Sequence, residues 1–161
     1  MTATAHALVS AAIYRAIPDP RLSIPLAFAS HFIMDTVPHW DFGTNWRSRS
    51  KKMTGLLAIA ETALGITVAY FLFQGKGNSL GLLSTIVAGE LPDWLEAPWY
   101  IFFARQNKHE PGARAGFWEK LTYRIYRLEN VFHARAVYPL GVITQIVTVA
   151  FFLLLLTRST G

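Results

Sequence analysis

The stretch that decides the fold is residues 22–41, LSIPLAFASHFIMDTVPHWD. Residues 22–37 have the composition of an apolar helix, but His31 and Asp35 interrupt it one helical turn apart. This i, i+4 spacing puts both side chains on one face. Pro38 ends or kinks the helix, so His39 and Asp41 are expected on a turn directly after it. Ionisable groups inside membrane helices are costly and are usually kept for a function. The stretch therefore predicts a membrane-embedded helix with a polar site at one end.

Composition extends this interpretation to the whole chain of 161 residues, which is 52% hydrophobic and 16% charged with a mean hydropathy of +0.29. Soluble domains carry roughly 25% charged residues. Each further apolar run is near the length that a helix needs to cross a bilayer, except the first, which is too short to span comfortably. The prediction is an all-α, polytopic transmembrane helical bundle forming one domain, 1–161, with four long spans and a short N-terminal helix. The candidate helices are 3–17, 22–37, 53–73, 80–104 and 136–157.

The basic residues predict the orientation. None of the 15 Lys and Arg residues lies well inside a predicted span, whereas four fall in 42–52 and seven in 105–135. Alternating spans place these two segments on the same side. The positive-inside rule then makes that side, with the N-terminus, cytoplasmic. The placement also accounts for the net charge of +5 without a nucleic-acid partner.

A further helix is expected at residues 116–132, GFWEKLTYRIYRLENVF, with an apolar stripe and several basic residues elsewhere on its surface. Such a basic amphipathic helix is typical of the membrane interface. Attraction to anionic lipid is one explanation of its charge. A sharper hypothesis is that Arg124 or Arg127 grips a substrate phosphate.

Histidines and carboxylates gather towards the predicted cytoplasmic ends. His6, Glu61 and Asp93 are expected at a depth similar to that of His31 and Asp35, with Glu61 roughly 12 Å from Met53 along its helix. Imidazole and carboxylate together suit zinc, and manganese or iron are alternatives. The opposing interpretation is a hydrogen-bonded pair that joins helices.

The roles of Glu90 with Asp93, and of His133, each have two interpretations. Glu90 and Asp93, three residues apart, either supply ligands for a second metal ion, as in di-iron bundles, or mark a helix break at Pro92 with an Asp cap. His133, just before the last span, either contributes a ligand or binds a phosphate, and we assign it no role.

The motifs Ala5-His6, Ser30-His31-Phe32-Ile33-Met34-Asp35-Thr36-Val37-Pro38-His39-Trp40-Asp41 and Leu91-Pro92-Asp93 carry a resemblance to a family. Over about its first two thirds, the chain resembles small bacterial and archaeal membrane-bound metal-dependent hydrolases, the inner-membrane putative hydrolases of domain-of-unknown-function type. The resemblance implies a prokaryotic inner membrane and a metal site at His6, His31, Asp35 and Asp93. The Thr-His-Ser-like element of many relatives is missing here.

The expected function is a membrane-embedded metal-dependent hydrolase acting on a phosphate-bearing lipid, with a homo-oligomer compatible with the sequence. His6, His31, Asp35, Glu61 and Asp93 would hold the metal, and Glu90, or His39 with Asp41, would take the proton from water. The alternatives are a cation or proton transporter or channel subunit that uses the same acids, a di-iron lipid oxidative enzyme, and a structural scaffold without metal.

Overall fold

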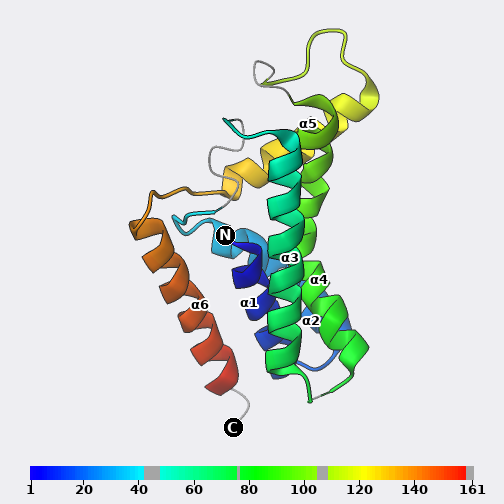
Figure 1. Ribbon diagram of the computed structural model, residues 1–161. Coiled ribbons are helices and arrows are strands. Elements are labelled where there is room, and N and C mark those ends of the chain that lie inside the picture. The colour runs from blue at the N-terminus through cyan, green and yellow to red at the C-terminus, as the bar shows by residue number, and fades with distance from the viewer. Residues whose placement is uncertain (42–47, 76, 105–108, 159–161) are drawn as a thin grey trace.

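The computed structural model describes residues 1–41, 48–75, 77–104 and 109–158 (Figure 1). Over these ranges the chain is all-helical, as predicted, and forms no strand beyond an isolated bridge between His39 and Arg135. A π-helix, Trp99–Phe103, directly follows the fourth α-helix. The six α-helices are α1 (Ala3–Ala16), α2 (Pro20–Asp35), α3 (Lys51–Phe73), α4 (Ser79–Pro98), α5 (Phe117–Phe132) and α6 (Leu140–Arg158).

Local capping explains where several helices begin. The Asp19 side chain accepts a hydrogen bond from Arg21 N at 2.9 Å, and Pro20 occupies the first position of α2, where a missing N–H costs nothing. Ser50 and Asn78 cap α3 and α4 in the same way. These side chains satisfy N–H groups that have no partner within the helix.

The last helix begins four residues later than predicted, at Leu140 instead of residue 136. The helix starts later because residues 134–136 are hydrogen-bonded to the end of α2 and to the segment after it. Similarly, the segment predicted as one helix over 80–104 is α-helical only to Pro98 and then widens into the π-helix. Pro92 lies inside α4 without ending it.

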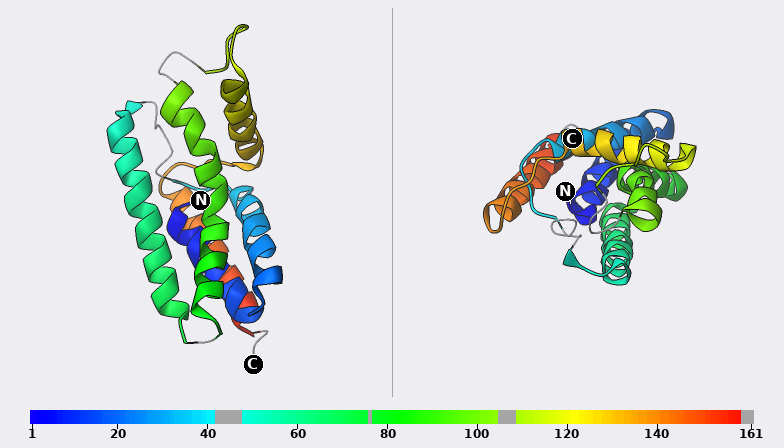
Figure 2. Two further views of the ribbon diagram at one scale, coloured as in Figure 1. Left: turned by 90° about the vertical axis from the view of Figure 1, so that its right-hand side faces the viewer. Right: turned by 90° about the horizontal axis from the view of Figure 1, so that it is seen from above.

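α1 is the central element of the bundle. It contacts α2, α3, α4 and α6, and Figure 2 shows it enclosed by these helices when viewed from above. Ten of its fourteen residues are buried, and many of these are Ala or Ser. Small side chains let helix backbones approach closely. Where α1 crosses α3, a Cβ added at Gly65 would lie 2.9 Å from Thr4 Cα, so the crossing requires a glycine.

The helices alternate in direction. In Figure 1 the α1–α2 and α3–α4 connections and the end of α6 lie at the bottom, while α1 and α3 begin higher up. This alternation is the one assumed from the sequence when the two basic segments were placed on the same side. α5 packs against α4 and the π-helix at the upper end.

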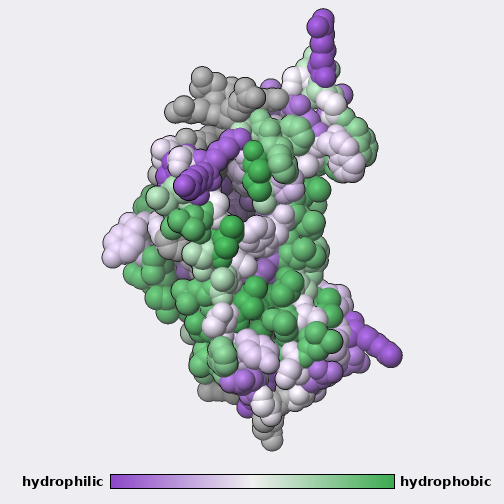
Figure 3. Space-filling view, turned by 45° about the vertical axis from the view of Figure 1, so that its right-hand side comes forward, coloured by the Kyte–Doolittle hydropathy of each residue, from purple (hydrophilic) through white to green (hydrophobic). Residues whose placement is uncertain are grey.

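Two helices, Lys51–Phe73 and the Leu140–Thr157 part of α6, are long and apolar enough to cross a membrane. Only 11% and 6% of their most apolar windows are buried, so these side chains do not form the core of this chain. Figure 3 shows hydrophobic side chains spread across one face, with the most hydrophilic ones gathered towards its two ends. The prediction of four spans is therefore supported for two helices, and the other two belong to the proposal below.

Candidate metal centre

Histidine and carboxylate side chains from α1, α2 and α4 meet in the upper part of the bundle. In a first group, ligand atoms of His6, His31 and Asp93 lie within 4.8 Å of one another. His31 Nε2 is 3.6 Å from Asp93 Oδ1 and 3.5 Å from Asp35 Oδ2, and His6 Nε2 is 3.2 Å from Asp35 Oδ1. The rings of His6 and His31 stack with centroids 3.9 Å apart. The first group therefore joins three helices around one small volume.

A second group consists of Asp35, His39 and His133, whose ligand atoms also lie within 4.8 Å of one another. Asp35 Oδ1 is 3.7 Å from His39 Nε2, and Asp35 Oδ2 is 3.5 Å from His133 Nδ1. His39 Nε2 and His133 Nε2 are 3.1 Å apart. His133 Nε2 is also 2.7 Å from Asp41 Oδ2, where its N–H can donate. The Met1 amino group contacts Asp35 as well.

Two of the imidazoles are held by backbone carbonyls. His31 Nδ1 is 2.8 Å from Gly89 O, and His39 Nδ1 is 2.8 Å from Val37 O. A carbonyl can only accept, so in each ring Nδ1 carries the proton and Nε2 presents a lone pair to the cluster. Such an outer hydrogen bond is the usual way of fixing the tautomer of a metal-binding histidine.

Backbone pairing brings the second group together. Ala134 N donates to Asp35 O at 2.8 Å, His39 N donates to Ala134 O at 3.1 Å, and Ala136 N donates to His39 O at 2.8 Å. The chain before α6 thus lies along the end of α2. This pairing places His133 beside Asp35 although the two are far apart in sequence.

The carboxyl group of Asp41 is held in its ionised form. Burial opposes ionisation, but the hydrogen bond from His133 outweighs it and holds the pKa of Asp41 well below its usual range. A carboxylate in this state is suited to orienting an imidazole. It is a poor acceptor for the proton of a water molecule, because it gives that proton up readily.

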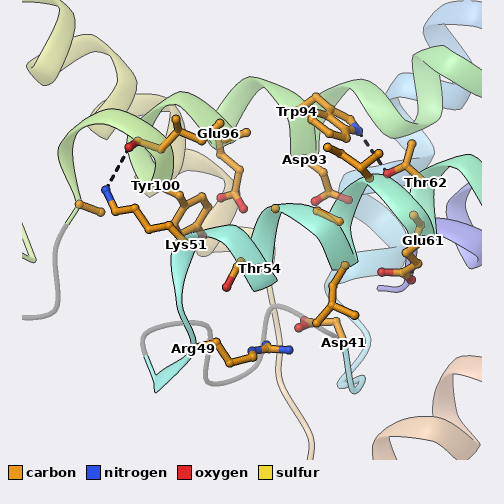
Figure 4. A pocket seen from close by; sticks show the side chains of 18 of the residues that line it. Asp41, Arg49, Lys51, Thr54, Glu61, Thr62, Asp93, Trp94, Glu96 and Tyr100 are labelled. Carbon is orange, nitrogen blue, oxygen red and sulfur yellow. Dashed lines mark hydrogen bonds between the residues drawn. The ribbon is translucent and has the colours of Figure 1, made fainter.

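A cavity of about 390 Å³ opens beside the cluster, between α3 and α4. Figure 4 shows Glu61 and Asp93 towards one end of this cavity and Lys51 towards the other, with the Arg49 side chain extending towards Asp41. Its walls are largely apolar, and its lining includes Leu57, Ala58, Ile59, Ala97 and Ile101. The cavity therefore combines carboxylates, cations and an apolar wall.

Of the predicted metal ligands, Glu61 lies outside both groups. Its Oε1 accepts a hydrogen bond from Ala3 N at 2.9 Å, at the start of α1, and the side chain lines the cavity. The other four predicted ligands, His6, His31, Asp35 and Asp93, do converge. The role of Glu61 as a ligand stays a prediction, and its position suits contact with a molecule in the cavity.

The predicted proton acceptors take different positions. Glu90 is buried, has no hydrogen-bond partner for either oxygen among the described residues, and does not line the cavity. His39 joins the second ligand group, and Asp41 lies against His133 at the cavity. Their catalytic roles are not tested by this arrangement, which places His39 where a ligand would lie.

Arg124 and Arg127, predicted to bind the substrate, are exposed on α5 and do not line the cavity. The basic side chains that line it are those of Arg49, Lys51 and Arg135. Lys51 Nζ donates to Ile101 O at 3.0 Å, in the middle of the π-helix. The phosphate-binding role of Arg124 and Arg127 therefore stays a prediction.

His133 is the site residue that the sequence did not assign. The one sequence feature that pointed to a role for His133 was its position just before the last apolar span. Nothing local to residue 133 indicates the pairing with residues 35–39 that brings it to Asp35.

The described residues thus contain buried His and Asp clusters that could hold a metal ion. Comparison with protein-family models, with curated proteins and with solved structures finds no match to this chain. The resemblance to membrane-bound metal-dependent hydrolases accordingly rests on the motifs alone, and the function is argued from the site.

Proposed function

We propose that this chain is an integral membrane hydrolase that uses a divalent metal to cleave a phosphate-bearing lipid. It belongs to the membrane-bound metal-dependent hydrolases that its motifs resemble, in a prokaryotic inner membrane. Its site faces the cytoplasmic side. Zinc is the metal that the donor set favours, with manganese or iron as alternatives.

The observation that carries the proposal is the spacing of ligand atoms among the first group and Asp35. Ligands of a tetrahedral zinc ion, at about 2.0–2.2 Å from the metal, lie about 3.3–3.6 Å from one another. The distances of His6 Nε2 and His31 Nε2 to Asp35, and of His31 Nε2 to Asp93, are 3.2, 3.5 and 3.6 Å. Hydrogen bonds of this kind are about 2.7–3.2 Å long, so two of the three separations suit a shared ion better than direct pairing.

Unsatisfied nitrogens support the same conclusion. His6 Nδ1 and His31 Nε2 have no hydrogen-bond partner among the described residues, although both side chains are almost fully buried, and His6 Nε2 faces Asp35 Oδ1 at 3.2 Å. A buried polar atom without a partner is costly. Coordination to a cation would remove that cost for one nitrogen of each ring.

Exposed apolar surface supports the membrane part of the proposal. Besides α3 and α6, α2 exposes Leu22 and Ile33, and α4 exposes Leu80 and Val87, each by more than 40%. Apolar side chains of this size on four neighbouring helices are suited to lipid. We therefore keep α2, α3, α4 and α6 as four spans around the enclosed α1.

The cavity suits an anionic lipid. Its apolar wall between α3 and α4 would accept acyl chains, and Arg49, Lys51 and Arg135 would attract a phosphate. Because these cations lie at the same cavity as Asp93 and His133, a phosphoester held by them would lie against the metal cluster.

Bound metal would polarise the phosphoester and lower the pKa of a coordinated water. In the cleavage, a water oxygen would bond to phosphorus as the ester P–O bond breaks, and one proton of the water would pass to a carboxylate and from it to the departing alcohol. Glu61 is the carboxylate best placed to take the proton of the water, because it lines the cavity and lies outside both ligand groups. The hydrogen bond from Ala3 N to its Oε1 holds it in place.

The test is elemental analysis of the detergent-purified chain, followed by phosphate release from a panel of phosphorylated lipids. We expect near-stoichiometric zinc or manganese, lost in His31→Ala and kept in His109→Ala, whose histidine is exposed and outside the cluster. Absence of any metal after reconstitution would overturn the proposal. Stoichiometric iron without phosphate release would replace hydrolysis by oxidation.

The orientation has a separate test. Reporter fusions after Gly77 and at the C-terminus are expected to report the side opposite the cytoplasm. A cytoplasmic signal from both would place the site on the other face.

A further inference from the structure

The first group accounts for His6, His31 and Asp93, but a second set of ligand atoms lies on the other side of Asp35. His39 and His133 come from the segments after α2 and after α5, and backbone hydrogen bonds hold these segments together. His39 is fully buried and His133 half-buried. A single ion bound by the first group would leave the imidazoles of His39 and His133 uncoordinated.

Asp35 faces both sets with both of its oxygens. Oδ1 is 3.2 Å from His6 Nε2 and 3.7 Å from His39 Nε2. Oδ2 is 3.5 Å from His31 Nε2 and 3.5 Å from His133 Nδ1. A carboxylate has about four lone-pair positions on its two oxygens, so one side chain can serve two ions at once.

Each histidine of the second set is oriented as a ligand would be. The Nδ1 proton of His39 is directed to Val37 O, which leaves Nε2 for a cation. For His133 the roles are reversed, because Nε2 is 2.7 Å from Asp41 Oδ2 and Nδ1 is the nitrogen near Asp35. Carboxylate–histidine–metal chains of this kind are common around bound metals.

We infer that the site binds two divalent cations, one held by His6, His31 and Asp93, the other by His39 and His133, with Asp35 shared between them. Asp41 orients His133. This inference rests on the proposed function for the presence of metal and adds the number of ions and the division of the ligands.

The charges fit this arrangement. Two divalent ions bring a charge of +4 and the Met1 amino group, which contacts Asp35, brings +1, while the three carboxylates Asp35, Asp41 and Asp93 bring −3. A phosphate-bearing substrate would complete the balance. Paired ions about 3.5–4 Å apart are suited to phosphoryl chemistry, because they stabilise both the attacking and the leaving oxygen. A dinuclear centre therefore suits a phosphoester substrate.

The experiment counts ions. The detergent-purified protein is stripped with a chelator, equilibrated with Mn²⁺ and freed of excess metal, and the bound manganese is then measured by mass spectrometry and by electron paramagnetic resonance. We expect about two ions per chain with the broadened spectrum of a spin-coupled pair. His31→Ala and His133→Ala should each retain about one ion, now with the hyperfine spectrum of an isolated Mn²⁺. His109→Ala should keep both ions.

The outcomes separate this inference from the proposed function. One ion per chain in the wild type, unchanged in His133→Ala, would overturn the dinuclear centre and leave a hydrolase with a single metal. No bound ion would overturn both. Two coupled ions without phosphate release from any lipid would support the centre and remove the substrate. Should His133→Ala fail to fold, Asp41→Asn removes only the orienting carboxylate and is expected to weaken binding of the second ion alone.

Discussion

The contact between α1 and α3 offers a test that joins the fold to the site. A Cβ at Gly65 would lie 2.9 Å from both Thr4 Cα and Thr4 N, and 3.1 Å from Ala3 C. Carbon atoms prefer separations of about 3.5–4.0 Å, so Gly65→Ala must move the two helices apart by about 0.6–1 Å. These neighbours are backbone atoms, which cannot rotate away. The displacement occurs two residues from His6, whose Nε2 is 3.2 Å from Asp35.

Overpacking of this kind costs about 1–3 kcal/mol, whereas replacing a helical glycine by alanine contributes about 1 kcal/mol in the opposite direction. Gly55→Ala is the matched control, because it lies on the same helix with nothing within 4 Å of its Cβ. The free energy of unfolding of Gly65→Ala should therefore be about 1–3 kcal/mol below that of Gly55→Ala, which corresponds to a melting temperature lower by about 2 °C or more. Metal affinity should fall about tenfold or more in Gly65→Ala alone. Equal melting temperatures and equal metal affinities would refute the close crossing and the position of His6 that depends on it.

Four further predictions concern the site and its surroundings. Gly141→Ala would place a Cβ 2.6 Å from Trp40 N. The variant should therefore be less stable than the wild type by about 1–3 kcal/mol in thermal melting, and metal analysis should show weaker binding of the second ion. Glu61→Gln should keep its metal and lose about 10²–10⁴-fold in phosphate release, whereas loss of metal would make Glu61 a ligand. When free metal is present at about a hundred times its Kd, chelation should lower the unfolding free energy by about 2.7 kcal/mol. Melting curves recorded before and after addition of the chelator measure this loss. Burial, and then the carboxylates Asp93 and Asp35, raise the pKa of Glu129 to about 7 from 4.5. The metal-free protein should therefore lose stability as pH rises between these values, because the unfolded chain releases this proton first. In denaturant titration, Glu129→Gln should be more stable than the wild type at pH 8 and no more stable at pH 4.

The helices could be predicted because their signals are local. Each long apolar run between basic segments became a helix, and capping residues such as Ser50 and Asn78 lie at the observed starts. The start of α6 could not be predicted in this way. Ala136 and Val137 are apolar, like the helix that follows, but hydrogen bonds with residues 35 and 39 hold residues 134–136 outside that helix.

The candidate site, too, could be predicted only where local spacing determines which side chains come together. The i, i+4 spacing of His31 and Asp35 correctly put both on one face of one helix, and the structure brings both into the cluster. For Glu90 and Asp93 an i, i+3 spacing predicted a shared face, yet only Asp93 reaches His31, while Glu90 lies outside both ligand groups. Spacing along a helix fixes a direction, but which of two neighbouring acids meets the site depends on how that helix is turned against its partners.

Gly89 shows why the packing and the site cannot be separated in this bundle. Having no side chain, it lets α1 approach, since a Cβ there would overlap the Ser10 hydroxyl and lie 3.0 Å from Ser10 Cβ. Its carbonyl accepts the Nδ1 proton of His31. The close approach of α1 is also what stacks His6 on His31. A larger residue at this position would both separate the helices and displace the acceptor that orients a ligand, so the small residues along α1 and its partners position the metal site as directly as the histidines that form it.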